Sequence, residues 1–286
     1  MTKPLTTLDY SRRLERVMDH IGAHLDEPLD LERLAAVACF SPYHFHRIYR
    51  AMTGETAADT LRRLRLHRAA GELVEGHPAI ERIARRAGYG SVAAFARAFR
   101  AGYGVPPAAY RKQGRLVPPS PLATATETAM YDVSIRDLQP VRLAALRHAG
   151  SYQEIGATFE RLFAWAAGRG LMSQQTRAIG VYYDDPDGAP AAALRSDAGI
   201  SVGPEVALEN GLRLLEVSGG RYAVLHHQGP YAELNKAYRW LYREWLPQSG
   251  EQCADRPIFE EYLNNPRALP PEQWLTDICL PLEGPQ

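Results

Sequence analysis

The sequence has few cysteines, no long apolar run and no recognisable catalytic constellation. Its three cysteines, Cys39, Cys253 and Cys279, are far apart in 286 residues and have no metal-ligand spacing, so we expect reduced core thiols and a cytoplasmic protein. No apolar stretch approaches the ~18 residues that cross a bilayer, and the start of the chain lacks the pattern of a signal peptide. Because no Ser/His/Asp, Cys/His or metal-spaced group is present, we expect no cofactor and no membrane partner.

Acidic residues are missing from one long stretch. From Arg82 through Thr126 the chain carries none. The formal net charge of 0 conceals this asymmetry, because residues 1–115 hold 19 Lys and Arg against 12 Asp and Glu, whereas residues 116–286 hold 14 against 21. A basic first half is typical of a domain that neutralises phosphates, so we expect double-stranded DNA as its partner. The acidic second half argues against nucleic-acid contacts there.

The chain divides into two predicted domains. Residues 116–129 are rich in Pro, Ser and Thr and have no periodicity, which indicates a semi-extended linker. We expect an all-α domain with two helix-turn-helix units at 1–115 and an α+β domain at 130–286.

Residues 41–50 form the most informative segment of the first domain. Phe45, Ile48 and Tyr49 recur at helical spacing and are expected to face a core, and Ser41 is a plausible N-cap. The opposite face is a polar stripe that could lie in a DNA major groove or could simply be solvated. It consists of Tyr43, His46, Arg47 and Arg50.

The segment recurs about fifty residues later. Phe45-His-Arg-Ile-Tyr-Arg50 returns as Phe95-Ala-Arg-Ala-Phe-Arg100. Each copy follows a short apolar helix, and a connecting helix is expected between them. Two short helices joined by a tight turn form a helix-turn-helix, so the repeat predicts two such units in tandem.

The second copy carries the most specific motif. Phe95-x-Arg-x-Phe99 followed by Gly104-Val-Pro-Pro-x-x-Tyr110-Arg111 resembles the DNA-binding domain of AraC/XylS-family transcription regulators. The resemblance implies that one helix of each unit enters a major-groove segment. The implied DNA-contacting residues are Tyr43, His46 and Arg47 in the first helix and Val92, Ala93, Ala96 and Arg97 in the second.

The second reading helix is less polar than the first. Val92, Ala93 and Ala96 offer no hydrogen-bonding side chain, and only Arg97 could read guanine bidentately. The two alanine and valine positions 92 and 93 could contact thymine methyls or only pack near the phosphates. We therefore expect the first unit to carry more of the base specificity.

The second domain also contains a tandem repeat, at an offset of 79 residues. Gly150-Ser-Tyr152 matches Gly229-Pro-Tyr231, and upstream β-prone runs align at the same offset. Each copy predicts two strands, a helix and two more strands. Two such units could form a sheet-built cleft on a pseudo-two-fold axis.

The end of the chain carries a second resemblance. Phe259-Glu-Glu-Tyr-Leu-Asn-Asn-Pro266 and Leu275-Thr-Asp-Ile278 resemble the gyrase-inhibitor-like (GyrI-like) small-molecule-binding domain. In drug-binding relatives a glutamate at the position of Glu260 pairs with cationic ligands.

Strand alternation supports that role for Glu260. It shares a face with Ile258 and Tyr262, and at the offset of 79 its counterpart is Val181, so the fold does not demand a carboxylate there. A buried carboxylate needs a partner, which a cation could supply, although a structural ion pair or an exposed side chain is the alternative. Aromatic residues that could be walls for a cation or could be ordinary core are Tyr152, Trp165, Tyr183, Tyr231, Trp240 and Tyr262.

These patterns predict a transcription regulator that senses an amphipathic or aromatic, possibly cationic, small molecule, with RNA polymerase as a possible further partner. Two alternatives remain open. The second domain could be a small-molecule hydrolase that uses Glu260 and Tyr262 to activate water, or it could sequester drugs.

Overall fold

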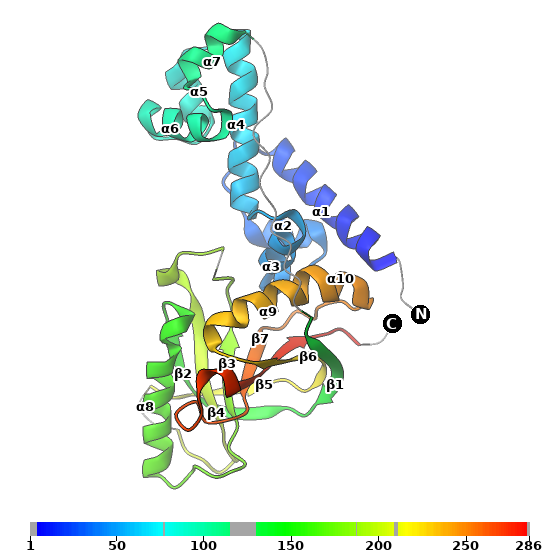
Figure 1. Ribbon diagram of the computed structural model, residues 1–286, viewed down its shortest axis with the longest axis vertical. Coiled ribbons are helices and arrows are strands. Elements are labelled where there is room, and N and C mark those ends of the chain that lie inside the picture. The colour runs from blue at the N-terminus through cyan, green and yellow to red at the C-terminus, as the bar shows by residue number, and fades with distance from the viewer. Residues whose placement is uncertain (1–4, 77, 115–129, 187, 209–210, 285–286) are drawn as a thin grey trace. The chain divides into compact units, whose positions relative to one another are not determined.

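The computed structural model describes residues 5–76, 78–114, 130–186, 188–208 and 211–284 (Figure 1). The chain divides into two compact units. The sheet unit comprises residues 1–10, 40–48 and 127–286, and the helical unit comprises residues 11–39 and 49–126. The boundary therefore falls inside one helix, α3 (Pro42–Thr53), whose first residues group with the C-terminal half of the chain. The predicted linker, 116–129, lies outside the described residues.

The helical unit begins its helices at polar caps. Asp30 caps α2 by accepting from Arg33 N, Thr56 caps α4 by accepting from Asp59 N, and Ser91 caps α6 by accepting from Ala94 N. Each cap satisfies an amide that has no partner inside its helix. The helices of this half of the chain are α1 (Leu5–Ala23), α2 (Leu31–Ala38), α3, α4 (Ala57–Glu75), α5 (Ile80–Arg86), α6 (Val92–Tyr103) and α7 (Pro107–Gln113).

The second predicted helix-turn-helix, α5 and α6, packs with α7 against α4. Phe95 and Phe99 of α6 are fully buried, and the ring of Phe99 meets that of Tyr110 from α7 edge-to-face at 5.2 Å. The turn after α5 needs a glycine at Gly88, where φ is +85° and an added Cβ would lie 2.7 Å from Arg65 Nη1. Arg65 itself donates to the Leu25 carbonyl at 2.7 Å, so this predicted surface arginine is a structural tie.

An antiparallel sheet of eight strands forms the centre of the sheet unit. Its strand order is β1-β6-β8-β7-β3-β4-β2-β5, with β7 and β3 side by side in the middle. The first strand of each half lies beside the second strand of the other half, because β1 pairs with β6 and β5 pairs with β2. The strands are β1 (Asp132–Leu138), β2 (Val141–Ala149), β3 (Ala178–Tyr182), β4 (Arg195–Ser201), β5 (Arg213–Val217), β6 (Gly220–Gln228), β7 (Ile258–Tyr262) and β8 (Leu275–Pro281).

Helices pack against the sheet at two places (Figure 1). The helix α8 (Ile155–Gly168) contacts β2 and β4, and α9 (Leu234–Trp240) contacts β6. Tyr262 meets Phe159 of α8 edge-to-face at 5.4 Å, so its strand face points toward the helices. The opposite face forms a core that includes Val181, Phe259 and Cys279.

One π-helical turn corrects the predicted repeat alignment. Leu241–Trp245 forms this turn between α9 and α10 (Leu246–Ser249). A π-turn accommodates one extra residue. Accordingly β6 follows β2 by 79 residues, whereas β7 follows β3 by 80. Glu260 therefore lies opposite Gly180 in the register, and the predicted counterpart Val181 pairs with Phe259.

The expectation of three core thiols was wrong for Cys39. Cys279 is buried and Cys253 is half-buried, but Cys39 is exposed at the end of α2, where its φ is 53°. No helix among the described residues is both long and apolar enough to cross a membrane.

Candidate functional site

Glu260 lies in the middle of the sheet, on the helix-facing side of β7. Its side chain is only 5% exposed. Directly across the register is Gly180, where an added Cβ would lie 2.9 Å from the Tyr182 hydroxyl and 3.0 Å from the Tyr262 hydroxyl. Glycine at this position therefore leaves room for two tyrosine side chains beside the carboxylate.

Both oxygens of Glu260 accept hydrogen bonds from tyrosines. The Tyr238 hydroxyl of α9 donates to Oε1 at 2.8 Å, and the Tyr262 hydroxyl donates to Oε2 at 2.8 Å. The Tyr182 hydroxyl lies 2.6 Å from that of Tyr262. Because a buried carboxylate costs free energy unless it is hydrogen-bonded, these phenols are what allow it to remain in the interior.

The electrostatic balance at Glu260 has opposing parts. Burial raises the pKa of its carboxyl, while the hydrogen bonds from Tyr238 and Tyr262 and the charge of Arg47 each lower that pKa, and the net direction is upward. Burial also raises the pKa values of Tyr238 and Tyr262, so both stay protonated as donors.

The upward shift predicts a pH dependence of stability. A carboxyl with a raised pKa binds its proton more tightly in the folded chain, so its stabilising contribution is present below the ordinary pKa of 4.5 and is lost as pH rises through the folded pKa. Glutamine cannot ionise. We therefore expect the unfolding free energy of Glu260→Gln, relative to the unsubstituted chain, to increase steadily from about pH 4 to about pH 8 in urea titrations. A difference that does not change with pH would contradict the raised pKa.

Two other predicted aromatic residues belong to the same cluster. The Tyr231 ring lies 5.3 Å from the Tyr262 ring, and the Tyr152 ring lies 4.8 Å from the Tyr182 ring. We call Glu260 and its five surrounding tyrosines the tyrosine cluster. Its tyrosines are Tyr152, Tyr182, Tyr231, Tyr238 and Tyr262.

The remaining predicted ligand residues lie elsewhere. Tyr183 donates to Asp197 at 2.6 Å, the Trp240 ring packs 5.4 Å from Tyr131, and Trp165 lies beneath the Arg169 guanidinium at 5.6 Å. None of these contacts reaches the tyrosine cluster. Neither Tyr182 nor Tyr238 was predicted for this site, although Tyr238 occupies a helix position in the repeat, because spacing on a helix does not reveal which strand it covers.

Arg47 is the unexpected member of the site. Its guanidinium carbon lies 4.7 Å from the centre of the Tyr238 ring, and Nη2 donates to the Asp184 carbonyl at 3.0 Å. Nη1 is buried and has no hydrogen-bond partner among the described residues. A side chain predicted to read DNA thus contacts the tyrosine cluster within the sheet unit.

A neighbouring histidine explains how α3 is held there. His44 is fully buried, its Nδ1 lies 2.8 Å from the Tyr242 hydroxyl and its Nε2 lies 2.9 Å from the Arg256 carbonyl. Burial lowers the pKa of His44 to about 3, so the ring is neutral, with Nε2–H donating to the carbonyl and Nδ1 accepting from the hydroxyl. The sequence analysis missed this residue, whose only signal is its position three residues after Ser41 on the face that also holds Ile48.

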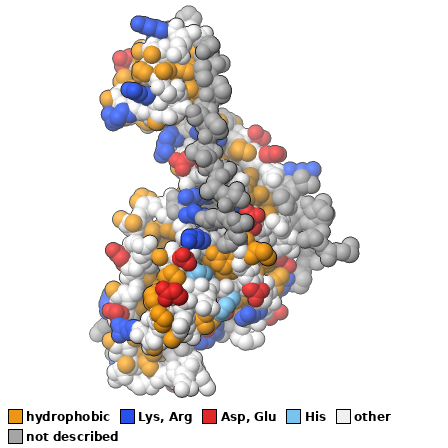
Figure 2. Space-filling view, viewed as in Figure 1, with side chains coloured by type: hydrophobic (Ala, Val, Ile, Leu, Met, Phe, Trp, Pro, Cys, Tyr) orange, Lys and Arg blue, Asp and Glu red, His pale blue; other side chains and the backbone are white. Residues whose placement is uncertain are grey.

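The other predicted DNA-contacting residues differ in exposure. Tyr43 and Val92 are both 37% exposed, and Ala93 and Arg97 are exposed too, whereas Ala96 and His46 are partly buried. In the helical unit, Figure 2 shows Lys and Arg side chains over the visible face of the α5–α7 region. The exposed residues on α6 are therefore available to a partner such as DNA.

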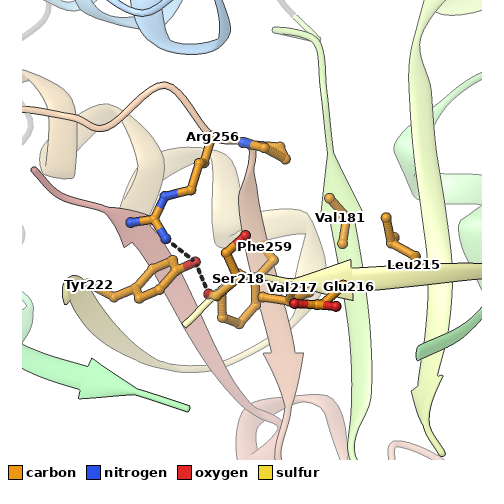
Figure 3. Close-up of a pocket in the computed structure, with 9 residues that line it drawn as sticks. Val181, Leu215, Glu216, Val217, Ser218, Tyr222, Arg256 and Phe259 are labelled. Atoms are coloured by element: carbon orange, nitrogen blue, oxygen red, sulfur yellow. Dashed lines mark hydrogen bonds between the residues drawn. The ribbon is translucent and has the colours of Figure 1, made fainter. Parts of the chain in front are cut away.

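A small pocket lies on the other face of the sheet (Figure 3). Its volume is about 60 Å³, and its lining includes Tyr222, Arg256 and Phe259. Ligand pockets usually have volumes of roughly 300 to 1,000 Å³, so this one is too small for a drug-sized molecule. Among the described residues, no group of three or more His, Cys, Asp and Glu side chains could hold a metal ion.

The fold and the site together define a two-part protein, in which a helical DNA-binding-type unit accompanies a sheet domain with a carboxylate among tyrosines. Residues 131–283 match the family model of the GyrI-like small molecule binding domain, and residues 34–113 match that of a helix-turn-helix domain. The chain belongs to the GyrI-like family and carries an AraC-type helix-turn-helix region, as the two resemblances in the sequence implied.

Relatives match the GyrI-like half of the chain. "Probable transcriptional regulator YgiV" of Escherichia coli strain K12 is 31% identical over 157 residues, which cover 53% of this chain and 96% of that protein. "DNA gyrase inhibitor" of Edwardsiella piscicida is 32% identical over 155 residues, covering 52% of this chain and 97% of that protein. The solved structure of an EcmrR–DNA complex aligns with a TM-score of 0.47 at 14% identity, covering 54% of this chain and 58% of that one.

Proposed function

We propose that this chain is a transcription regulator that binds DNA through its helix-turn-helix units and senses an aromatic or amphipathic cation at the tyrosine cluster. The observation that carries the proposal is the buried Glu260 carboxylate, which holds a negative charge among aromatic rings without a direct ion pair in the described residues. Aromatic faces attract cations, and a carboxylate in low dielectric gains most from an opposite charge. An organic cation with aromatic groups fits both features.

The DNA-binding part of the proposal rests on two helices. On α6, Arg97 is exposed and could donate bidentately to guanine, beside Val92 and Ala93 and the partly buried Ala96. On α3, Tyr43, His46 and Arg47 offer the more polar set. A contact with RNA polymerase and a cytoplasmic location belong to the same proposal.

Genome-wide mapping of bound sites tests this function, because it would supply the operator and, through neighbouring genes, the ligand class. On an operator found in this way, Arg97→Ala is expected to lose about 1 to 3 kcal/mol of specific binding in gel-shift titrations. Glu160→Ala, a substitution on the surface of the sheet unit, is the control that should leave the affinity unchanged. Equal affinity for Arg97→Ala would remove this residue from the reading surface.

The repeat in the second half supports the proposed geometry. We infer that the sheet unit consists of two ββαββ repeats, since its strand order reads the same from either end when each strand is matched to its counterpart. Under this reading the pseudo-two-fold axis passes between β3 and β7. Glu260 breaks the symmetry, because Gly180 occupies the equivalent position.

A hydrolase remains the second candidate because one specific contact favours it. The 2.8 Å hydrogen bond from Tyr262 to Glu260 joins the two groups that would activate water. Turnover of an activated aryl ester by the full chain, lost in Glu260→Gln, would establish this activity. Ligand-dependent protection without product would leave sensing. Unchanged transcription on ligand addition would favour sequestration.

A further inference from the structure

The start of α3 is bound to the sheet unit at three successive points. Ser41 Oγ donates to Asp255 Oδ1 at 2.8 Å and also accepts from Tyr43 N at 3.3 Å. His44 bridges the Tyr242 hydroxyl and the Arg256 carbonyl, as described above. Arg47 is the third point, and the only one of the three that carries a full positive charge.

Arg47 presents to the tyrosine cluster the chemistry expected of the ligand. Its guanidinium lies over the Tyr238 ring, and Tyr238 donates to Glu260. Its positive charge also acts on the carboxyl of Glu260. The planar cation therefore occupies the environment in which an aromatic cation would be stabilised.

We propose that Arg47 is an internal competitor for the cation site, so that α3 binds the tyrosine cluster in the absence of ligand and is released when an external cation takes its place. This inference rests on the proposed function, because it assigns the regulation of that same site. The residues that hold α3 on the sheet unit include Arg47 and its neighbour His44, so a DNA contact by Arg47 and its contact with Tyr238 exclude each other.

The contact is suited to exchange. Arg47 makes one hydrogen bond and one cation–π contact, while its buried Nη1 lacks a partner in the described part of the chain. A buried donor without an acceptor opposes docking, so a cation that needs fewer hydrogen bonds than guanidinium can displace it. By thermodynamic linkage, the ligand and the docked α3 must weaken each other by the same factor.

Equilibrium dialysis of the full chain with tetraphenylphosphonium tests the competition. Arg47→Ala is expected to bind this aromatic cation about tenfold more tightly than the unsubstituted chain, within the usual range of coupling between sites. Asp255→Ala removes the acceptor of Ser41 but keeps Arg47, and it should bind about threefold more tightly. Arg82→Ala, an exposed arginine of α5, is the matched control and should leave the affinity unchanged.

Hydrogen exchange of residues 42–48 provides a second measurement. Exchange should increase when tetraphenylphosphonium is added, and it should increase without ligand in Glu260→Gln, because the charge that attracts Arg47 is then missing. Equal affinity of the unsubstituted chain, Arg47→Ala and Asp255→Ala, with exchange unchanged by the cation, would overturn the competition and leave cation binding intact. Failure of every protein to bind the cation would instead overturn the proposed sensing function, and the competition with it.

Discussion

Glu260→Gln, made in a chain that also carries Arg47→Ala, is expected to weaken tetraphenylphosphonium binding by roughly 30-fold or more. The estimate follows from the cost of about 2 kcal/mol or more for removing one partner of a buried charge pair. Glutamine keeps the shape of the side chain and an oxygen that can accept from Tyr238 or Tyr262, so the substitution removes mainly the charge. In the chain with Arg47 present, the loss should be smaller, because the carboxylate attracts the internal competitor as well as the ligand.

A neutral molecule of similar shape supplies the control for this experiment. Triphenylphosphine oxide carries the same phenyl groups without a net charge, so its affinity should change little between the two proteins. If both compounds lose affinity equally, Glu260 shapes the site and does not recognise charge. That result would contradict electrostatic recognition at the tyrosine cluster.

Asp197→Ala is expected to lower the unfolding free energy by about 3 to 5 kcal/mol. Asp197 on β4 is fully buried and forms ion pairs with Arg213 and with Arg147, the latter at 3.4 Å. Tyr183 also donates to it at 2.6 Å. Removing the carboxylate leaves two cations without their shared counter-charge in a partly desolvated position, which costs far more than losing a surface contact.

Urea unfolding of the full chain, followed by the fluorescence of the sheet unit, measures this loss. The matched control is Glu160→Ala, which removes an ion pair with Arg267 whose side chains are 63% and 73% exposed. Exposed pairs contribute about 0 to 1 kcal/mol. A loss below about 1 kcal/mol for Asp197→Ala would show that the two arginines are stabilised by water instead of by the carboxylate.

The helical half could be predicted from the sequence because its signals are local. The spacing of Phe95 and Phe99 places both on one helix face, and both side chains are fully buried. Ser41 was expected to cap its helix, and its hydroxyl accepts from Tyr43 N. A helix is determined largely by residues within four positions of each other, so the pattern of a short segment is sufficient.

The sheet half was predictable only in part. Alternation correctly placed Glu260 and Tyr262 on one strand face, where they are hydrogen-bonded. The alignment that matched Val181 to Glu260 was off by one residue, because an inserted residue inside a helix can form a π-turn without any visible change in hydrophobic pattern. Such a shift of one residue moves every side chain of a strand to the other face.

By itself, the sequence determined that Arg47 lies on the helix face opposite Phe45 and Ile48, and that Glu260 shares a strand face with Tyr262. Only the tertiary structure decided what covers these faces. Arg47 lies over Tyr238, which is nearly two hundred residues away, and Gly180 leaves the space in which two tyrosines reach the carboxylate. Helix and strand periods fix the direction of a side chain relative to its own backbone, whereas its partner depends on which distant surfaces pack together.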